Sequence, residues 1–324
     1  MCGRYASARK RQDLLEEFRI ERDLVTNDLE PDYNVAPTKP VYAVLTRALP
    51  SPPPRSAPAP AQRGSAARDG KGGQARSAEP AKDVARELRV VRWGLVPSWA
   101  KDPAIGSRMI NARVETVDSK PSFRSAFAKR RCLLPADGFY EWIKVEQDGK
   151  TRKQPYYIHR ADDGELAFAG LYELWRDKSQ PDDHPRAWLW TTVIITTTAP
   201  DEAGRIHDRM PMVIDPARWG DWLDPANNAP ANVHPLLLPA AASGLVSYPV
   251  GTDVNYVRNN GPGLIKPLDP STGGTGHAAG GLPGQKGPRN GPIGGQPGQA
   301  LAEDRPARTR NRYRPSDSAP LSLF

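Results

Sequence analysis

The sequence predicts an α+β fold, mainly antiparallel and barrel-like β-structure with short flanking helices. Runs rich in β-branched and aromatic residues recur along the chain and are joined by turn signals such as Asp148-Gly149. Helical periodicity, in contrast, is short and scattered. The repeated strand–helix–strand units of a doubly wound parallel sheet are therefore not expected.

Two stretches of the chain lack the apolar side chains that a core needs. Residues 50–87 contain seven Pro and four Gly, and residues 268–324 contain eight Pro and eleven Gly. Neither stretch can bury enough apolar surface to offset the entropy lost on ordering. We therefore expect one folded domain, residues 1–267, with a disordered insert at 50–87 and a disordered tail at 268–324.

The expected elements follow in chain order. The first is an amphipathic helix from Asp13 to Phe18, followed by a loop from Tyr33 to Pro37. Val41 to Leu45 and Leu88 to Val96 should then pair as a hairpin whose turn is expanded by the insert, since loop length costs little free energy. Further strands are expected at Cys132 to Pro135, Phe139 to Val145, Pro155 to His159, Ala167 to Tyr172, Trp188 to Thr198, Met212 to Ile214 and Val246 to Val250.

The net charge of +8 does not by itself indicate a nucleic-acid partner. Each low-complexity stretch carries seven Lys or Arg against four Asp or Glu, which leaves the folded part near +2. A nucleic-acid interface would have to rest on a local patch.

The sequence lacks the features of a secreted, membrane-bound or metal-binding protein. No apolar segment follows the basic residues near the N-terminus, and nowhere do eighteen apolar residues run together. We therefore expect a cytoplasmic protein without membrane association. Cys2 and Cys132 lie far apart without metal-ligand spacing, so we expect no disulfide framework, no metal and no cofactor. Cys132 lies in an apolar run and is interpreted as a core residue.

Cys2 is the residue with the most distinctive chemistry. Removal of Met1 would leave an α-amine and a thiol on adjacent carbons. An α-amine has a pKa of about 7.7 to 8.0, so part of it is an unprotonated nucleophile near neutral pH. With an aldehyde it gives a Schiff base, which the thiol can close to a five-membered thiazolidine.

Two other functions also fit a cysteine at this position. The start Met1-Cys2-Gly3 resembles class II glutamine amidotransferases, which are amidohydrolases with an N-terminal nucleophile. Against this, Arg4-Tyr5 replaces their apolar strand start, and their later glutamine-binding motifs have no match. The remaining alternative is a protein that binds single-stranded DNA without a covalent bond.

Six short motifs occur in one order along the chain. They are Cys2-Gly3-Arg4-Tyr5, Tyr33-Asn34-Val35-Ala36-Pro37, Trp93-Gly94-Leu95-Val96-Pro97-Ser98-Trp99, Ile110-Asn111-Ala112-Arg113-Val114-Glu115-Thr116, Ala136-Asp137-Gly138-Phe139-Tyr140-Glu141-Trp142 and Ile206-His207-Asp208-Arg209-Met210-Pro211. Together they resemble the SRAP family of abasic-site processing proteins, the SOS-response-associated group that crosslinks itself to abasic sites in single-stranded DNA. The resemblance covers Cys2 to about Pro267 without the insert.

The resemblance implies a catalytic group of four residues. Cys2 would form the thiazolidine, and Glu141 would accept the proton of the terminal amine as a general base. His207 would handle protons at the sugar oxygen. Asn111 would hydrogen-bond to the lesion. The implied activity is lyase-like Schiff-base chemistry in the DNA damage response, and older descriptions of the family add a peptidase activity.

The resemblance also implies a DNA interface. Arg113 matches a position that contacts phosphates, and Arg4 and Arg209 are further phosphate candidates. Trp99 and Pro37 would form an apolar wall on which a flanking base stacks. Ala100 replaces an aromatic residue found in some members, which narrows that wall. The expected partner is single-stranded DNA with abasic sites, bound by a monomer that associates with the nucleoid. The insert and the tail are expected to be dispensable for crosslinking.

Overall fold

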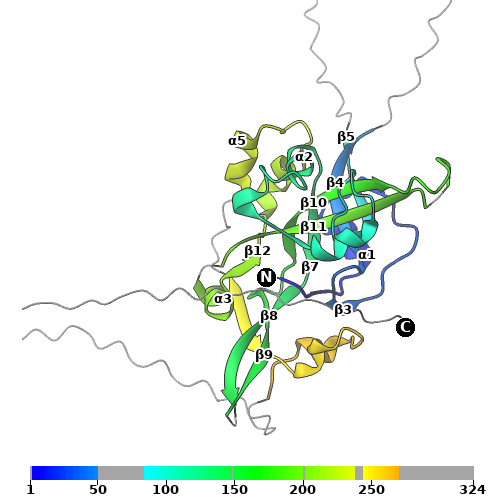
Figure 1. The fold of residues 1–324 in the computed structure, drawn as a ribbon. Coiled ribbons are helices and arrows are strands. Elements are labelled where there is room, and N and C mark those ends of the chain that lie inside the picture. Colours follow the sequence, from blue (N-terminus) through cyan, green and yellow to red (C-terminus); the bar gives the residue numbers. More distant parts are fainter. Residues whose placement is uncertain are drawn as a thin grey trace, which may run out of the picture. The chain divides into compact units, whose positions relative to one another are not determined.

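The structure is a computed structural model, drawn in Figure 1. It describes residues 2–49, 84–147, 149–184, 186–199, 201–237 and 244–269. The predicted tail beyond residue 269 and the predicted insert up to residue 83 lie outside the described residues. Within the described part of the chain, no helix is long and apolar enough to cross a membrane.

Five strands close into a barrel. They are β4 (Pro40–Ala48), β5 (Val84–Trp93), β7 (Arg131–Ala136), β10 (Leu166–Arg176) and β11 (Trp188–Thr198). Neighbours along the path β11-β10-β7-β4-β5 pair antiparallel. The barrel closes where β5 meets β11 in a parallel pairing that places Trp93 opposite Thr192. The predicted barrel-like and mainly antiparallel β-structure is thus confirmed, and β5 and β11 form a parallel closing pair.

A second sheet of five strands packs beside the barrel and is antiparallel throughout. Its order is β13 (Leu245–Pro249), β9 (Lys150–Arg160), β8 (Gly138–Gln147), β1 (Tyr5–Ser7) and β3 (Asp32–Val35). Strands β8 and β9 form the long hairpin in the lower part of Figure 1. Gly149, in the turn, has a φ of +69°, a conformation that glycine adopts at no steric cost.

The remaining elements are short. The helices are α1 (Arg11–Glu17), α2 (Arg124–Lys129), α3 (Asp201–Ile206), α4 (Trp219–Leu223) and α5 (Pro230–Val233), and the extra strands are β2 (Arg22–Asp23), β6 (Asn111–Arg113) and β12 (Arg209–Pro211). The short 3₁₀ helices are η1 (Pro103–Arg108), η2 (Val114–Thr116), η3 (Pro216–Arg218), η4 (His234–Leu237), η5 (Thr252–Asn255) and η6 (Pro262–Ile265).

Side-chain alternation along the strands divides the core into layers. On β4, Val41, Ala43 and Leu45 belong to the buried cluster inside the barrel, which also contains Cys2. Their neighbours on β4, Tyr42 and Val44, belong to a cluster outside the barrel. Helices α1, α2 and α4 cover this outer face with their apolar side chains.

Most expected elements are present, with shifted ends. The helix from Asp13 is confirmed as α1, and the hairpin across the insert is confirmed as β4 and β5. Strand β5 begins at Val84, although the sequence analysis assigned residues 84–87 to the insert. A buried glutamate is tolerated in this strand because its charge is balanced. Glu87 is 1% exposed and forms ion pairs with Arg22 and Arg89, at 2.7 and 2.8 Å.

Two expectations about local structure are wrong. The strand expected at Met212 to Ile214 lies three residues earlier, as β12, and only Val213 forms an isolated bridge with Phe168. The loop expected from Tyr33 is mostly strand β3, which pairs with β1. Such short strands form through pairing with distant segments, so local patterns do not predict them.

A half-buried carboxyl group just before β10 gives a prediction about stability. Burial and the charge of Asp137 raise the pKa of Glu165 from 4.5 to about 8. The folded protein then binds more protons at this group than the unfolded chain, so stability should fall as pH rises from about 4.5 to about 8. Glu165→Gln should remove this loss and stabilise the protein by about 1 kcal/mol or more above pH 8, measured by urea unfolding. An unchanged pH dependence of unfolding in the variant would contradict it.

Candidate active site

Cys2 lies inside the barrel cluster and is 0% exposed. Its carbonyl oxygen accepts a hydrogen bond of 2.7 Å from Nδ2 of Asn111, and its Sγ lies 3.9 Å from the carbonyl oxygen of Arg4. Burial and the negative charge of Glu141 raise the pKa of the Cys2 thiol far above 9. Cys2 therefore presents a neutral thiol in place of a thiolate, which is the more nucleophilic form.

Glu141 reaches this site because of the period-two alternation of β8. Phe139, two residues earlier, belongs to the barrel cluster together with Cys2, whereas Tyr140 belongs to the cluster on the opposite face. Glu141 is 3% exposed, and burial raises its pKa above 4.5. The positive charges of the chain's amino terminus and of His207 oppose that shift. The carboxylate thus lies close enough to His207, one of the groups with which it would exchange protons, to feel its charge.

Asn111 and His207 reach the site along the two edges of β11. Strand β6 pairs in parallel with one edge, placing Asn111 opposite Ile194, and β12 pairs with the other, placing Met210 opposite Thr197. The indole of Trp93 donates to the carbonyl of Ile110 at 2.9 Å and fixes the start of β6. The chain before β6 also requires glycine at position 94. Gly94 has a φ of +124°, and a Cβ there would lie 2.6 Å from the carbonyl oxygen of Gly106.

His207 lies between α3 and β12, with two contacts at one ring nitrogen. Its Nδ1 lies 2.9 Å from the backbone nitrogen of Arg209, which donates, and 2.8 Å from Oδ1 of Asp208. The neutral ring accepts from Arg209 through Nδ1, and the protonated ring donates to Asp208 through the same atom. Nδ1 of His207 thus has both a hydrogen-bond donor and an acceptor within reach.

Some of the predicted DNA-binding residues are accessible to solvent, and others are hydrogen-bonded to residues of the protein itself. Trp99 is 61% exposed, Arg113 is exposed and Pro37 is half-buried, so all three are accessible from solvent. Arg209 instead binds Oε1 and Oε2 of Glu115 at 2.5 and 3.1 Å and is only 11% exposed. Arg4 binds Asn34 and the carbonyl of Val254. Contacts of these residues with phosphate remain predictions.

The structure brings together the four residues predicted to be catalytic. Asn111 hydrogen-bonds to Cys2, the charge of Glu141 acts on the Cys2 thiol, and the charge of His207 acts on Glu141. Sequence reasoning missed Glu115 and Asn34 as partners of the arginines. Both lie inside the motifs that indicated the site, but nothing local shows which arginine each one contacts.

The family model described as SOS response associated peptidase (SRAP) matches residues 1–257. The chain belongs to the SRAP family. It is 37% identical over 266 residues to YoqW of Bacillus subtilis strain 168, named an abasic site processing protein, with 82% of this chain and 99% of that one covered. It is also 34% identical over 218 residues to HMCES of Gallus gallus, which bears the same description, with 59% of this chain and 60% of that one covered.

A solved structure has a similar fold. The crystal structure of a protein from Bacteroides thetaiotaomicron matches with a TM-score of 0.59 and 24% identity, covering 82% of this chain and 100% of that one. At this identity the likeness concerns the fold alone. It agrees with the single SRAP domain that the sequence motifs predicted.

Proposed function

We propose that this protein captures abasic sites in single-stranded DNA by forming a thiazolidine crosslink through Cys2 once Met1 has been removed. Relatives that align over most of this chain are named abasic site processing proteins, which supports the substrate. The observation that carries the chemistry is a cysteine at position 2, buried beside Glu141 and held by Asn111. The protein would act in the DNA damage response, in the cytoplasm at the nucleoid.

The proposed reaction has two bond-forming steps. The Cys2 amine attacks the aldehyde carbon of the ring-opened sugar, and the resulting carbinolamine loses one water to give the iminium. The thiol sulfur then adds to the same carbon, and its proton passes to a neighbouring base. Amine, thiol and aldehyde become one thiazolidine and one water, without an oxidant or reductant.

The side chains around Cys2 match the proton transfers in these steps. Glu141 accepts a proton from the terminal ammonium, which makes the amine nucleophilic. His207 supplies a proton to the sugar oxygen during ring opening and to the hydroxyl that leaves as water. Asn111 holds the Cys2 carbonyl, which fixes the direction of the amine and the thiol.

The DNA strand would run across the exposed residues near this site. The Trp99 ring offers a face to a flanking base, and stacking accepts any base, at about 1–3 kcal/mol per base. Arg113 follows Asn111 on β6 and would take a phosphate beside the lesion. This arrangement favours single-stranded DNA, in which bases are free to stack on protein.

The direct test is incubation of the full chain with an oligonucleotide in which uracil glycosylase has created one abasic site. We expect a band that survives heating on a denaturing gel, and an adduct mass equal to protein plus DNA minus one water. The same oligonucleotide without the lesion is the control. Equal, salt-sensitive binding with and without the lesion and no covalent band would instead indicate a non-covalent binder. An intact protein mass that retains Met1 would contradict the proposal, because the amine would be blocked.

A further inference from the structure

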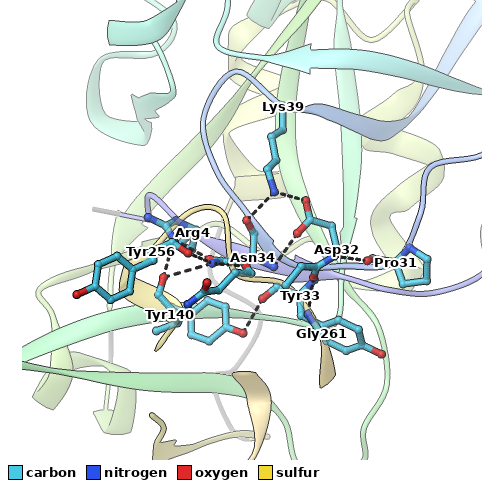
Figure 2. A network of polar contacts seen from close by, with 12 residues as sticks. Arg4, Pro31, Asp32, Tyr33, Asn34, Lys39, Tyr140, Tyr256 and Gly261 are labelled. Atoms are coloured by element: carbon cyan, nitrogen blue, oxygen red, sulfur yellow. Dashed lines mark hydrogen bonds and ion pairs between the residues drawn. The ribbon is translucent and has the colours of Figure 1, made fainter. Parts of the chain in front are cut away.

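Asn34 lies at the centre of a polar network that joins the N-terminal segment to residues 254–259 (Figure 2). Its side chain is completely buried. Nδ2 donates to the carbonyl oxygens of Tyr256 and Asn259 at 3.0 and 2.9 Å, and Oδ1 accepts from Nη1 of Arg4 at 2.7 Å. All hydrogen-bonding groups of this amide are therefore used to hold two distant segments together.

The guanidinium of Arg4 is turned inward into this network (Figure 2). Nη1 also donates to the carbonyl oxygen of Val254 at 2.7 Å, and burial lowers the pKa of Arg4. Nε is buried and has no hydrogen-bond partner among the described residues. A buried donor without a partner costs free energy, so the position of Arg4 is maintained by the rest of the network.

The main chain of Arg4 connects this network to the reacting residue. The carbonyl oxygen of Arg4 accepts from the backbone nitrogen of Tyr140 at 3.0 Å, next to Glu141 on β8, and lies 3.9 Å from Sγ of Cys2. The Tyr140 hydroxyl donates to the carbonyl of Tyr33 at 2.8 Å, beside Asn34. The segment before β1 is thus held through its backbone on β8 and through the Arg4 side chain at Asn34 and Val254.

We propose that Arg4 is a positioning residue for Cys2. With Asn34 it locks residues 2–4 against residues 254–259, so that the amine and thiol of Cys2 stay aligned with Glu141. This role rests on the proposed function of Cys2 and differs from a phosphate contact, because the Arg4 side chain is bonded to Asn34 and Val254. Residues 254–259 are thereby part of the machinery that orients the nucleophile.

The first test separates rate from affinity. In Arg4→Ala, crosslinking at saturating DNA should slow about tenfold or more because the nucleophile is misplaced. Affinity for lesion-free single-stranded DNA and its dependence on salt should stay as in the wild type. Arg4→Lys, which keeps the charge and reaches one of the two acceptors, should recover part of the rate. Arg113→Ala is the matched control, with weaker binding and a salt slope shallower by about 0.7, as expected when one phosphate contact is lost.

The second test needs no DNA and is independent of the proposed function. Cys2 should be alkylated by iodoacetamide faster in Arg4→Ala than in the wild type, with buried Cys132 as the internal reference, followed by mass spectrometry of the N-terminal peptide. If circular dichroism shows that Arg4→Ala does not fold, Arg4→Lys and Asn34→Ser replace it in both the crosslinking and the alkylation experiment. If the wild-type protein does not crosslink to DNA, the proposed function is wrong. The alkylation rates of Cys2 still test the positioning role of Arg4 in that case. Wild-type rates in both tests, or a loss of DNA affinity with a shallower salt slope, overturn the inference.

Discussion

Replacing Cys2 with serine should abolish the heat-stable DNA adduct and leave the affinity for single-stranded DNA nearly unchanged. The variant keeps the terminal amine, so it still forms a Schiff base with the aldehyde. Its hydroxyl is a much weaker nucleophile than a thiol towards the iminium carbon, and the open imine hydrolyses on heating. Denaturing gels after heating measure the loss. Borohydride before heating should restore a band, because it reduces the imine to a stable amine.

Cys132 provides a matched control for this experiment. It is also completely buried, and its Sγ lies 3.5 Å from Oγ1 of Thr192, a contact that a serine hydroxyl can keep. Cys132→Ser should therefore crosslink like the wild type. A heat-stable adduct at wild-type yield in Cys2→Ser would show that the thiol is not part of the bond to DNA.

The residues of the site were predictable where local rules determine their position. The position of Cys2 next to the initiator methionine indicates its chemistry directly. Glu141 was predicted only through the resemblance to the SRAP family, and the alternation of β8 explains why it lies on the same face as the apolar Phe139. The hairpin of β4 and β5 was recognisable from the apolar runs of its strands, despite the insert between them.

The parts that sequence reasoning missed depend on contacts between distant residues. Strand β6 has three residues and exists because β11 offers a free edge to it, so nothing in Asn111–Arg113 alone predicts a strand. The partner of Arg209, Glu115, lies 94 residues away in the chain, and Asn34 lies 30 residues from Arg4. An arginine inside a motif can bind phosphate or a side chain of its own protein, and only the three-dimensional contacts distinguish these roles.

The burial of Cys2 also affects the order of the proposed steps. A thiolate would attack the aldehyde readily and give a reversible thiohemiacetal before the amine reacts. Because burial raises the pKa of the thiol and keeps it protonated, the amine would react first in the proposed reaction, and the sulfur would add to the iminium, a far better electrophile than the aldehyde. In the proposed reaction, burial of the thiol would thus favour addition of the sulfur after the iminium has formed.

Glu141→Gln should slow crosslinking by about a hundredfold, the lower end of what a positioned general base contributes. Glutamine has nearly the same shape and keeps the packing of β8, so the fold and the affinity for DNA should stay as in the wild type. Single-turnover crosslinking at saturating DNA measures the rate. Glu146→Gln is the matched control, since Glu146 lies exposed on the same strand and its contact, Oγ1 of Thr151 at 2.6 Å, is remote from Cys2.

The pH profile of the same two proteins tests whether the carboxylate acts as a base. Burial raises the pKa of Glu141 above 4.5, and the base is active only when ionised. The wild-type rate should therefore fall as pH drops through this raised pKa, in addition to the fall caused by protonation of the terminal amine. Glu141→Gln should lose the carboxylate component and keep only that of the amine, whose ordinary pKa is about 7.7 to 8.0. A variant that matches the wild type in rate and profile would show that the buried charge of Glu141 serves the fold and not the reaction.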